Sequence, residues 1–108
     1  MSTGSHDVHP VLKAIIQVVP GLARTLGDGV EVLVHEFSHP EDALVAIAGN
    51  LTGRQVGAPL SDLVLKQLRQ GTLNDDTINY SSRTPDGREI RSSTILVRDN
   101  DGKVLGCL

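Results

Sequence analysis

The chain has 108 residues, of which 39% are hydrophobic and only 2% aromatic. This length and composition suit one folded domain with a modest core of Val, Leu and Ile, and exclude a disordered chain. The net charge of −3, the scattered Lys and Arg and the scarcity of aromatic side chains argue against direct contact with nucleic acid.

The only cysteine, Cys107, excludes an intrachain disulfide and fits a reducing, cytoplasmic location. Its position in an apolar run favours a small buried side chain over a reactive thiol. No apolar stretch approaches the roughly 18 residues of a membrane span, and no signal peptide pattern is present. We therefore expect no membrane partner.

Residues 1–7 are small and polar and are expected to form a disordered or tag-derived tail. Over 8–26, apolar residues recur every three or four positions, which predicts an amphipathic helix with Asp7 as its N-cap and Gly27 as its stop. Pro20 predicts a kink or a division into two shorter helices. The wide apolar stripe would cover a sheet or contact a second copy of the chain.

Apolar, β-branched segments at 30–37 and 43–49 predict two strands, the first apolar on both faces. A glycine-rich loop at 49–59 precedes a predicted helix at 60–71 that ends at Gly71. Further strands are predicted at 77–84, 89–99 and 103–108, with turns at 85–88 and 100–102. The order predicts an α+β fold, an antiparallel sheet with helices packed on one face.

Two motifs fail on inspection. A phosphate-binding P-loop requires Lys and Ser or Thr after its last glycine, whereas Arg54 and Gln55 follow Gly53. The string "HEFSH" at 35–39 matches a zinc-protease pattern, but that pattern requires a helix and this segment is a strand that runs into Pro40. We expect no metal site, and His35 could bind a metal only through another geometry.

Three segments carry a resemblance: "EVLVHEF" (31–37), "IAGNLTGRQVGAPLSDLVLK" (47–66) and "INYSSRTPDGREIRSSTILVRDNDGKVLGCL" (78–108). In this order and spacing the chain resembles the YheO-like PAS domain family over about residues 8–108. The chain departs from the usual family pattern at Glu36 and at Gly49–Asn50. The resemblance implies a five-stranded antiparallel PAS sheet with an N-terminal amphipathic helix. It also implies a bacterial transcriptional regulator whose C-terminal helix-turn-helix domain is absent from this chain.

On this basis we expect a sensory and dimerising domain that binds a small metabolite between helices and sheet, and no catalytic residue. Arg54 would hold an anionic group, and polar side chains would complete the contacts. The candidate ligand-binding residues are His35, Asn50, Arg54, Tyr80, Ser92 and Ser93. Ser92 and Ser93 are neighbours on a strand, so only one of them can face a given pocket. The sequence identifies no cofactor.

Each candidate also has a purely structural interpretation. His35 could make a hydrogen bond within the core, and Asn50 could hold the loop by bonding its own backbone. Arg54 could be exposed or cap its own loop, and Tyr80 and the serines could bond across strands or be exposed. The whole chain could be a homodimerising module without a ligand. An enzyme that uses His35 and Glu36 lacks a convincing nucleophile or third partner.

Overall fold

The structure is a computed structural model that describes residues 8–108. The expected tail at 1–7 and the expected cap Asp7 lie outside the described residues. The predicted helices and strands are present with ends displaced by a few residues, except that the single strand predicted at 89–99 is divided into two. In chain order the elements are α1 (Pro10–Leu26), β1 (Val32–Glu36), a 3-10 helix (Pro40–Asp42), β2 (Leu44–Ala48), α2 (Asp62–Gln70), β3 (Thr77–Arg83), β4 (Glu89–Thr94), β5 (Leu96–Arg98) and β6 (Val104–Cys107).

Helix α1 begins after His9, whose ring Nδ1 accepts the backbone N–H of Val11 at 3.1 Å and so takes the capping role expected of Asp7. Pro10 occupies the first turn, where its missing N–H costs nothing. The helix continues through Pro20 and ends at Leu26, with Gly27 after it as its cap. Of the two alternatives predicted for Pro20, a kink or a division into two helices, the division is therefore wrong.

The strands form two antiparallel sheets, one of four strands in the order β2-β1-β6-β5 and one of the two strands β3-β4. The single five-stranded sheet is therefore not formed, because the segment expected as one long strand changes partner at Ile95. Ile95 exchanges both backbone hydrogen bonds with Leu108, at 2.9 and 2.8 Å. On the other side, the Asp76 carboxylate accepts the N–H of Leu96 at 2.8 Å and ends the pairing with β3.

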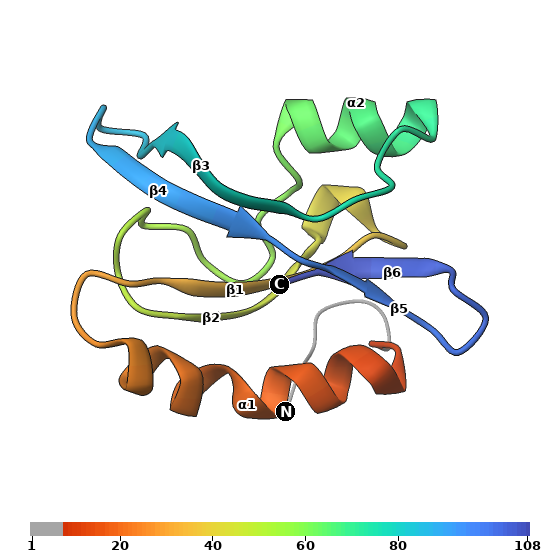
Figure 1. The fold of residues 1–108 in the computed structure, drawn as a ribbon, viewed down its shortest axis with the longest axis horizontal. Helices are drawn as coiled ribbons and strands as arrows, with labels where there is room; N and C mark the ends of the chain where they lie inside the picture. The colour runs from red at the N-terminus through yellow and green to blue at the C-terminus, as the bar shows by residue number, and fades with distance from the viewer. Residues whose placement is uncertain (1–7) are drawn as a thin grey trace.

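The two helices lie on opposite faces of the four-stranded sheet (Figure 1). Leu12 and Val19 of α1 pack on Val32 and Val34 of β1. On the other face, α2 and its flanking residues pack over a second buried cluster, formed by Phe37, Ala43, Leu60, Leu96 and Cys107. The expectation that helices cover one face is thus wrong. The physical reason is that the second face also carries apolar residues, Leu96 of β5 and Cys107 of β6, which need cover as the α1 face does.

The β3–β4 hairpin leaves the plane of the sheet on the same side as α2 (Figure 1). Along β4, half-buried residues alternate with exposed ones, so one side of the hairpin faces the rest of the molecule. The hairpin, α2 and the glycine-rich loop thus surround the α2 face of the sheet. None of the helices in residues 8–108 is long and apolar enough to cross a membrane.

Candidate functional site

His35 lies on the α2 face of β1, directly opposite Cys107 of β6. Its Nδ1 is 3.9 Å from the Cys107 Sγ. Burial, and after it the charge of Arg54, lowers the pKa of His35 to about 4, while burial raises the pKa of Cys107 to about 11. Both groups are therefore uncharged at neutral pH. When the thiol donates to Nδ1, the imidazole proton is on Nε2.

Arg54 is half-buried in the glycine-rich loop, near enough to His35 for its charge to lower the imidazole pKa. One guanidinium nitrogen donates to the backbone carbonyl of Pro59. Arg54 therefore makes a hydrogen bond within its own loop, which agrees with its structural interpretation. A guanidinium has five N–H donors, so donors remain for another acceptor.

The glycine-rich loop does bind an anion, but the anion is the carboxylate of Glu31. Glu31 Oε2 accepts the backbone N–H groups of Leu51 and Thr52 at 2.8 and 3.1 Å, and Oε1 accepts the Thr52 hydroxyl at 2.8 Å. Consecutive backbone amides that converge in this way form an anion-binding concavity. The Glu31 carboxylate thus already accepts the N–H groups that such a concavity would offer to a phosphate.

The hairpin carries a row of hydroxyl groups on its half-buried side. Tyr80 lies opposite Ser92. The Tyr80 hydroxyl is 2.9 Å from Thr94 Oγ1, and Ser92 Oγ is 2.5 Å from Ser82 Oγ. The cross-strand hydrogen bonds weighed as an alternative are therefore present, and Tyr80 and Ser92 share one face.

Ser93 lies on the other, exposed side of β4, where its hydroxyl accepts the backbone N–H of Asn79 at 3.0 Å. As expected from strand geometry, it does not share a face with Ser92. Asn79 is in the left-handed region, with φ 56°, at an irregularity in the β3–β4 pairing. Ser93 thus supports the hairpin backbone at this irregularity.

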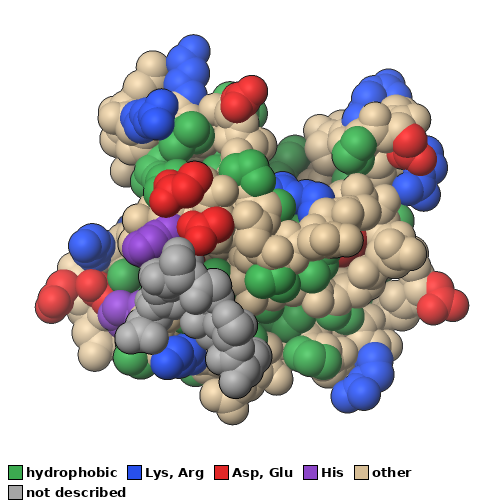
Figure 2. Space-filling view, turned by 180° about the vertical axis from the view of Figure 1, so that it is seen from behind, with side chains coloured by type: hydrophobic (Ala, Val, Ile, Leu, Met, Phe, Trp, Pro, Cys, Tyr) green, Lys and Arg blue, Asp and Glu red, His purple; other side chains and the backbone are tan. Residues whose placement is uncertain are grey.

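Arg88 joins the hairpin to the glycine-rich loop. Its guanidinium donates to the carbonyl of Leu51 at 2.8 Å, and its Nε lies 3.1 and 3.2 Å from the Asp86 carboxylate oxygens. Seen from behind, the molecule is hollowed between the α2 lobe and the hairpin lobe, and Lys or Arg side-chain atoms lie at the base of the hollow (Figure 2).

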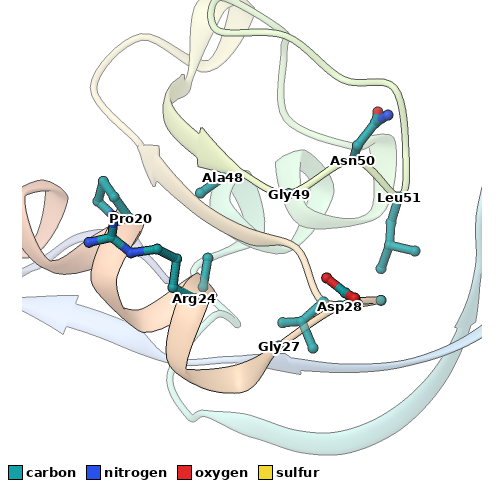
Figure 3. A pocket seen from close by; sticks show the side chains of 11 residues that line it. Pro20, Arg24, Gly27, Asp28, Ala48, Gly49, Asn50 and Leu51 are labelled. Atoms are coloured by element: carbon teal, nitrogen blue, oxygen red, sulfur yellow. The ribbon is translucent and has the colours of Figure 1, made fainter.

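Asn50 lies apart from the other candidates. It is exposed and lines a groove of about 630 Å³ between the end of α1 and the loops at the ends of β1 and β2. Arg24 and Asp28 line the same groove, and the Asn50 amide points away from both (Figure 3). The structure therefore brings His35 and Arg54 together, sets Tyr80 and Ser92 on the hairpin, and separates Asn50 and Ser93 from them.

Two residues of this region escaped the sequence analysis, Glu31 and Arg88. The contacts that involve them join positions 20 and 37 residues apart, which no local pattern reveals. An acidic residue at the start of an otherwise apolar strand was the one available signal for Glu31. Residues 8–108 bring together no group of three or more His, Cys, Asp or Glu side chains able to hold a metal ion.

The element order and the antiparallel pairing fit a PAS-type domain. The chain belongs to the YheO-like PAS domain family, whose model matches residues 6–108. Among curated proteins, "Uncharacterized protein YheO" of Escherichia coli K12 is 34% identical over 101 residues, which cover 91% of this chain and 42% of that protein. An "Uncharacterized protein" of Haemophilus influenzae is 29% identical over 99 residues, or 91% and 45% of the two chains. The chain thus spans less than half the length of these relatives, and no solved structure matches it.

Proposed function

We propose that the chain is the sensory and dimerising domain of a cytoplasmic bacterial transcriptional regulator, and that it binds a small anionic metabolite and controls a separate DNA-binding domain. The observation that carries the ligand proposal is a half-buried Arg54, whose guanidinium bonds to its own loop through one nitrogen, near a half-buried His35 whose Nδ1 faces Cys107. The charge of Arg54 also lowers the pKa of His35. The ligand would lie in the hollow between α2 and the hairpin, where Lys or Arg side-chain atoms reach the base (Figure 2).

The chemistry of this pair favours a carboxylate. Arg54 offers a permanent charge and several N–H donors, and His35 offers an Nε2–H when Cys107 donates to Nδ1. A carboxylate accepts hydrogen bonds without offering any, so it suits a site made of donors, and it can bind a guanidinium through both oxygens. The negative charge of Glu31 is compatible with a bound carboxylate, because the backbone N–H groups of Leu51 and Thr52 already stabilise that charge through hydrogen bonds. Tyr80 and Ser92 would add hydroxyl contacts from the hairpin.

Dimerisation would use the outer side of α1. The side chain of Val18 is 54% exposed there, beside the exposed Ala14 and Gly21, while Leu12 and Val19 are buried against the sheet. A small, apolar helix surface of this kind suits a second copy of the same helix. Ligand occupancy would alter gene expression only if the ligand favours one arrangement of the dimer over another.

Native mass spectrometry of the purified domain tests both halves of the proposal, since it reports subunit number and any retained small molecule. We expect a dimer with added mass on each chain, and we expect the added mass to be lost in Arg54→Met. The control is Arg91→Met, because Arg91 lies on the exposed side of β4, where it donates to the Asn79 carbonyl of the hairpin itself. Equal retention in both variants would remove Arg54 from the site.

A ligand-free dimerisation module is the second candidate. It is favoured by the internal pairing of the polar groups, because the hydroxyls of Tyr80 and Ser92 already bond across the hairpin. Dimers of bare chains that bind no carboxylate would support this alternative. We propose no catalytic function, since His35 and Glu36 cannot act on one substrate. His35 faces the α2 side, whereas the Glu36 carboxylate accepts the His9 N–H at 3.3 Å beside α1.

A further inference from the structure

We propose that Glu31 is a positioning residue for the His35–Arg54 pair. Together with Arg88 it clamps the Leu51–Thr52 segment and thereby directs Arg54 toward His35. The ligand part of this idea rests on the proposed function, but the clamp itself can be tested without any ligand. We call the contacts of Glu31 and Arg88 with Leu51–Thr52 the loop clamp.

The Glu31 side of the loop clamp uses both carboxylate oxygens and three donors. Oε2 accepts the N–H groups of Leu51 and Thr52, and Oε1 accepts the Thr52 hydroxyl. The same hydroxyl accepts the backbone N–H of Arg54 at 3.2 Å. Its proton therefore points at Glu31 and its lone pair at Arg54, so the bonds from Glu31 to the loop N–H groups and through Thr52 to Arg54 require two acceptor oxygens at position 31, of which glutamine keeps only one.

The Arg88 side holds the other end of the same residue. The Leu51 carbonyl accepts from Arg88 at 2.8 Å, while the Leu51 N–H donates to Glu31 at 2.8 Å. Asp86 orients the Arg88 guanidinium through its Nε. The Thr84 hydroxyl accepts the backbone N–H of Arg88 at 3.0 Å. A shift of the Leu51 carbonyl would therefore also displace Arg88 and Asp86 at the turn of the hairpin.

The backbone is shaped for this arrangement. At Gly49, where the loop leaves β2, φ is 103° and an added Cβ would lie 2.3 Å from the Val30 carbonyl oxygen. At Gly53, between Thr52 and Arg54, φ is 73°. Both values fall in the region that glycine alone occupies freely. The chain is thus turned twice within five residues, and Glu31 binds between the two turns.

The test follows the His35 ring by NMR during a pH titration of the wild type and of Glu31→Gln. We expect the His35 pKa to rise in Glu31→Gln toward the value found in Arg54→Met, because the loop no longer holds the Arg54 charge near the imidazole. The direct effect of removing a negative charge has the opposite sign, since it would lower the pKa of a histidine. An unchanged or lowered pKa would overturn the proposal.

A double variant separates movement of Arg54 from a general loosening of the loop. In the Arg54→Met background, Glu31→Gln should add no further rise, since the charge it displaces is already gone. An equal rise in both backgrounds would mean that His35 is merely rehydrated and would contradict the proposal. Glu89→Gln is the matched control, because Glu89 is an exposed carboxylate of β4.

Arg88→Lys tests the other side of the loop clamp. Lysine keeps the charge but loses the planar fork that reaches Asp86 and Leu51 together. The His35 pKa should again rise, and an unchanged value would remove Arg88 from the clamp.

Acetate added to the same samples separates this proposal from the function proposed above. If acetate leaves the wild-type His35 signals unchanged while Glu31→Gln raises the pKa, the loop clamp stands and the carboxylate site loses its support.

Discussion

Gly106 of β6 lies directly opposite Glu36 of the neighbouring antiparallel strand β1. A Cβ at this position would be 2.0 Å from the His35 carbonyl oxygen, which is backbone and cannot move aside without shifting the strand. We expect Gly106→Ala to lower the free energy of unfolding by about 3 kcal/mol, as overpacking of a core does. Urea denaturation followed by circular dichroism measures it.

Gly21 provides the matched control for that substitution. It lies within α1, and a Cβ there would meet nothing within 4 Å. Because alanine has less freedom than glycine in the unfolded chain, Gly21→Ala should stabilise the protein by about 0.5–1 kcal/mol. Both glycine substitutions are compared in the Val18→Lys background, since Gly21 lies on the helix surface proposed for dimerisation. Similar losses for both substitutions would show that the contact of Gly106 with the backbone of β1 is not tight.

His35 makes the stability depend on pH in a defined window. Its pKa is about 4 in the folded protein and near 6.5 when unfolded, so only the unfolded state takes up the proton as the pH falls through this range. The stabilisation is complete above about pH 6.5 and is lost progressively down to about pH 4, by roughly 3 kcal/mol in total.

His35→Gln isolates this contribution, because glutamine does not titrate. Between neutral pH and about pH 4, the unfolding free energy of the wild type should fall by roughly 3 kcal/mol more than that of His35→Gln. The measurement is urea denaturation of both proteins at several pH values. Parallel pH profiles would mean that His35 is already accessible to protons in the folded state.

At the scale of the element, helix α1 depends on a cap supplied by a histidine. The His9 ring accepts the Val11 N–H, one of the donors that a helix start leaves without an intrahelical partner. His9→Ala should lower the unfolding free energy by about 1 kcal/mol, whereas His9→Asn, a good N-cap, should retain it. Thermal denaturation compares the three proteins, and an equal loss in both variants would contradict the capping role.

The glycine-rich loop shows why an element can be found in the sequence while its role is not. Its glycines predicted a turn that leads into the helix from 60 to 71, and α2 does begin there, with the Ser61 side chain as its cap. The loop conformation, however, depends on Glu31 and Arg88, which come from distant elements. The local sequence shows which backbone conformations the loop can adopt. Hydrogen bonds with side chains far away in the chain then stabilise one of these conformations.

The strand expected at 89–99 illustrates the same limit. Its β-branched residues indicated an extended chain, and the chain is extended on both sides of Ile95. The change of partner at this point comes from Asp76 and Leu108, which take the backbone groups on either side. Strand propensity does not specify which neighbour receives each hydrogen bond.

At the scale of the whole molecule, the outer side of α1 gives a test of self-association. Val18→Lys should convert the proposed dimer into a monomer, since it places a charge in the middle of the exposed apolar surface. Gln17→Lys is the control, because Gln17 is an exposed polar residue on the neighbouring side of the helix. Light scattering after size exclusion gives the mass of each, and a dimer in Val18→Lys would place the interface elsewhere.

The sequence by itself determined the α+β class, the order of the elements, the burial of Cys107 and the family, because these follow from periodicity, glycine and proline positions and motif order. Only the tertiary structure decided that α1 and α2 cover opposite faces and that the sheet divides at Ile95. It decided as well that the Glu31 carboxylate binds the backbone N–H groups of the glycine-rich loop. It also separated Asn50 and Ser93 from the pair His35–Arg54. The reason is physical: local patterns fix how each segment folds, whereas these features depend on contacts between residues far apart in the chain.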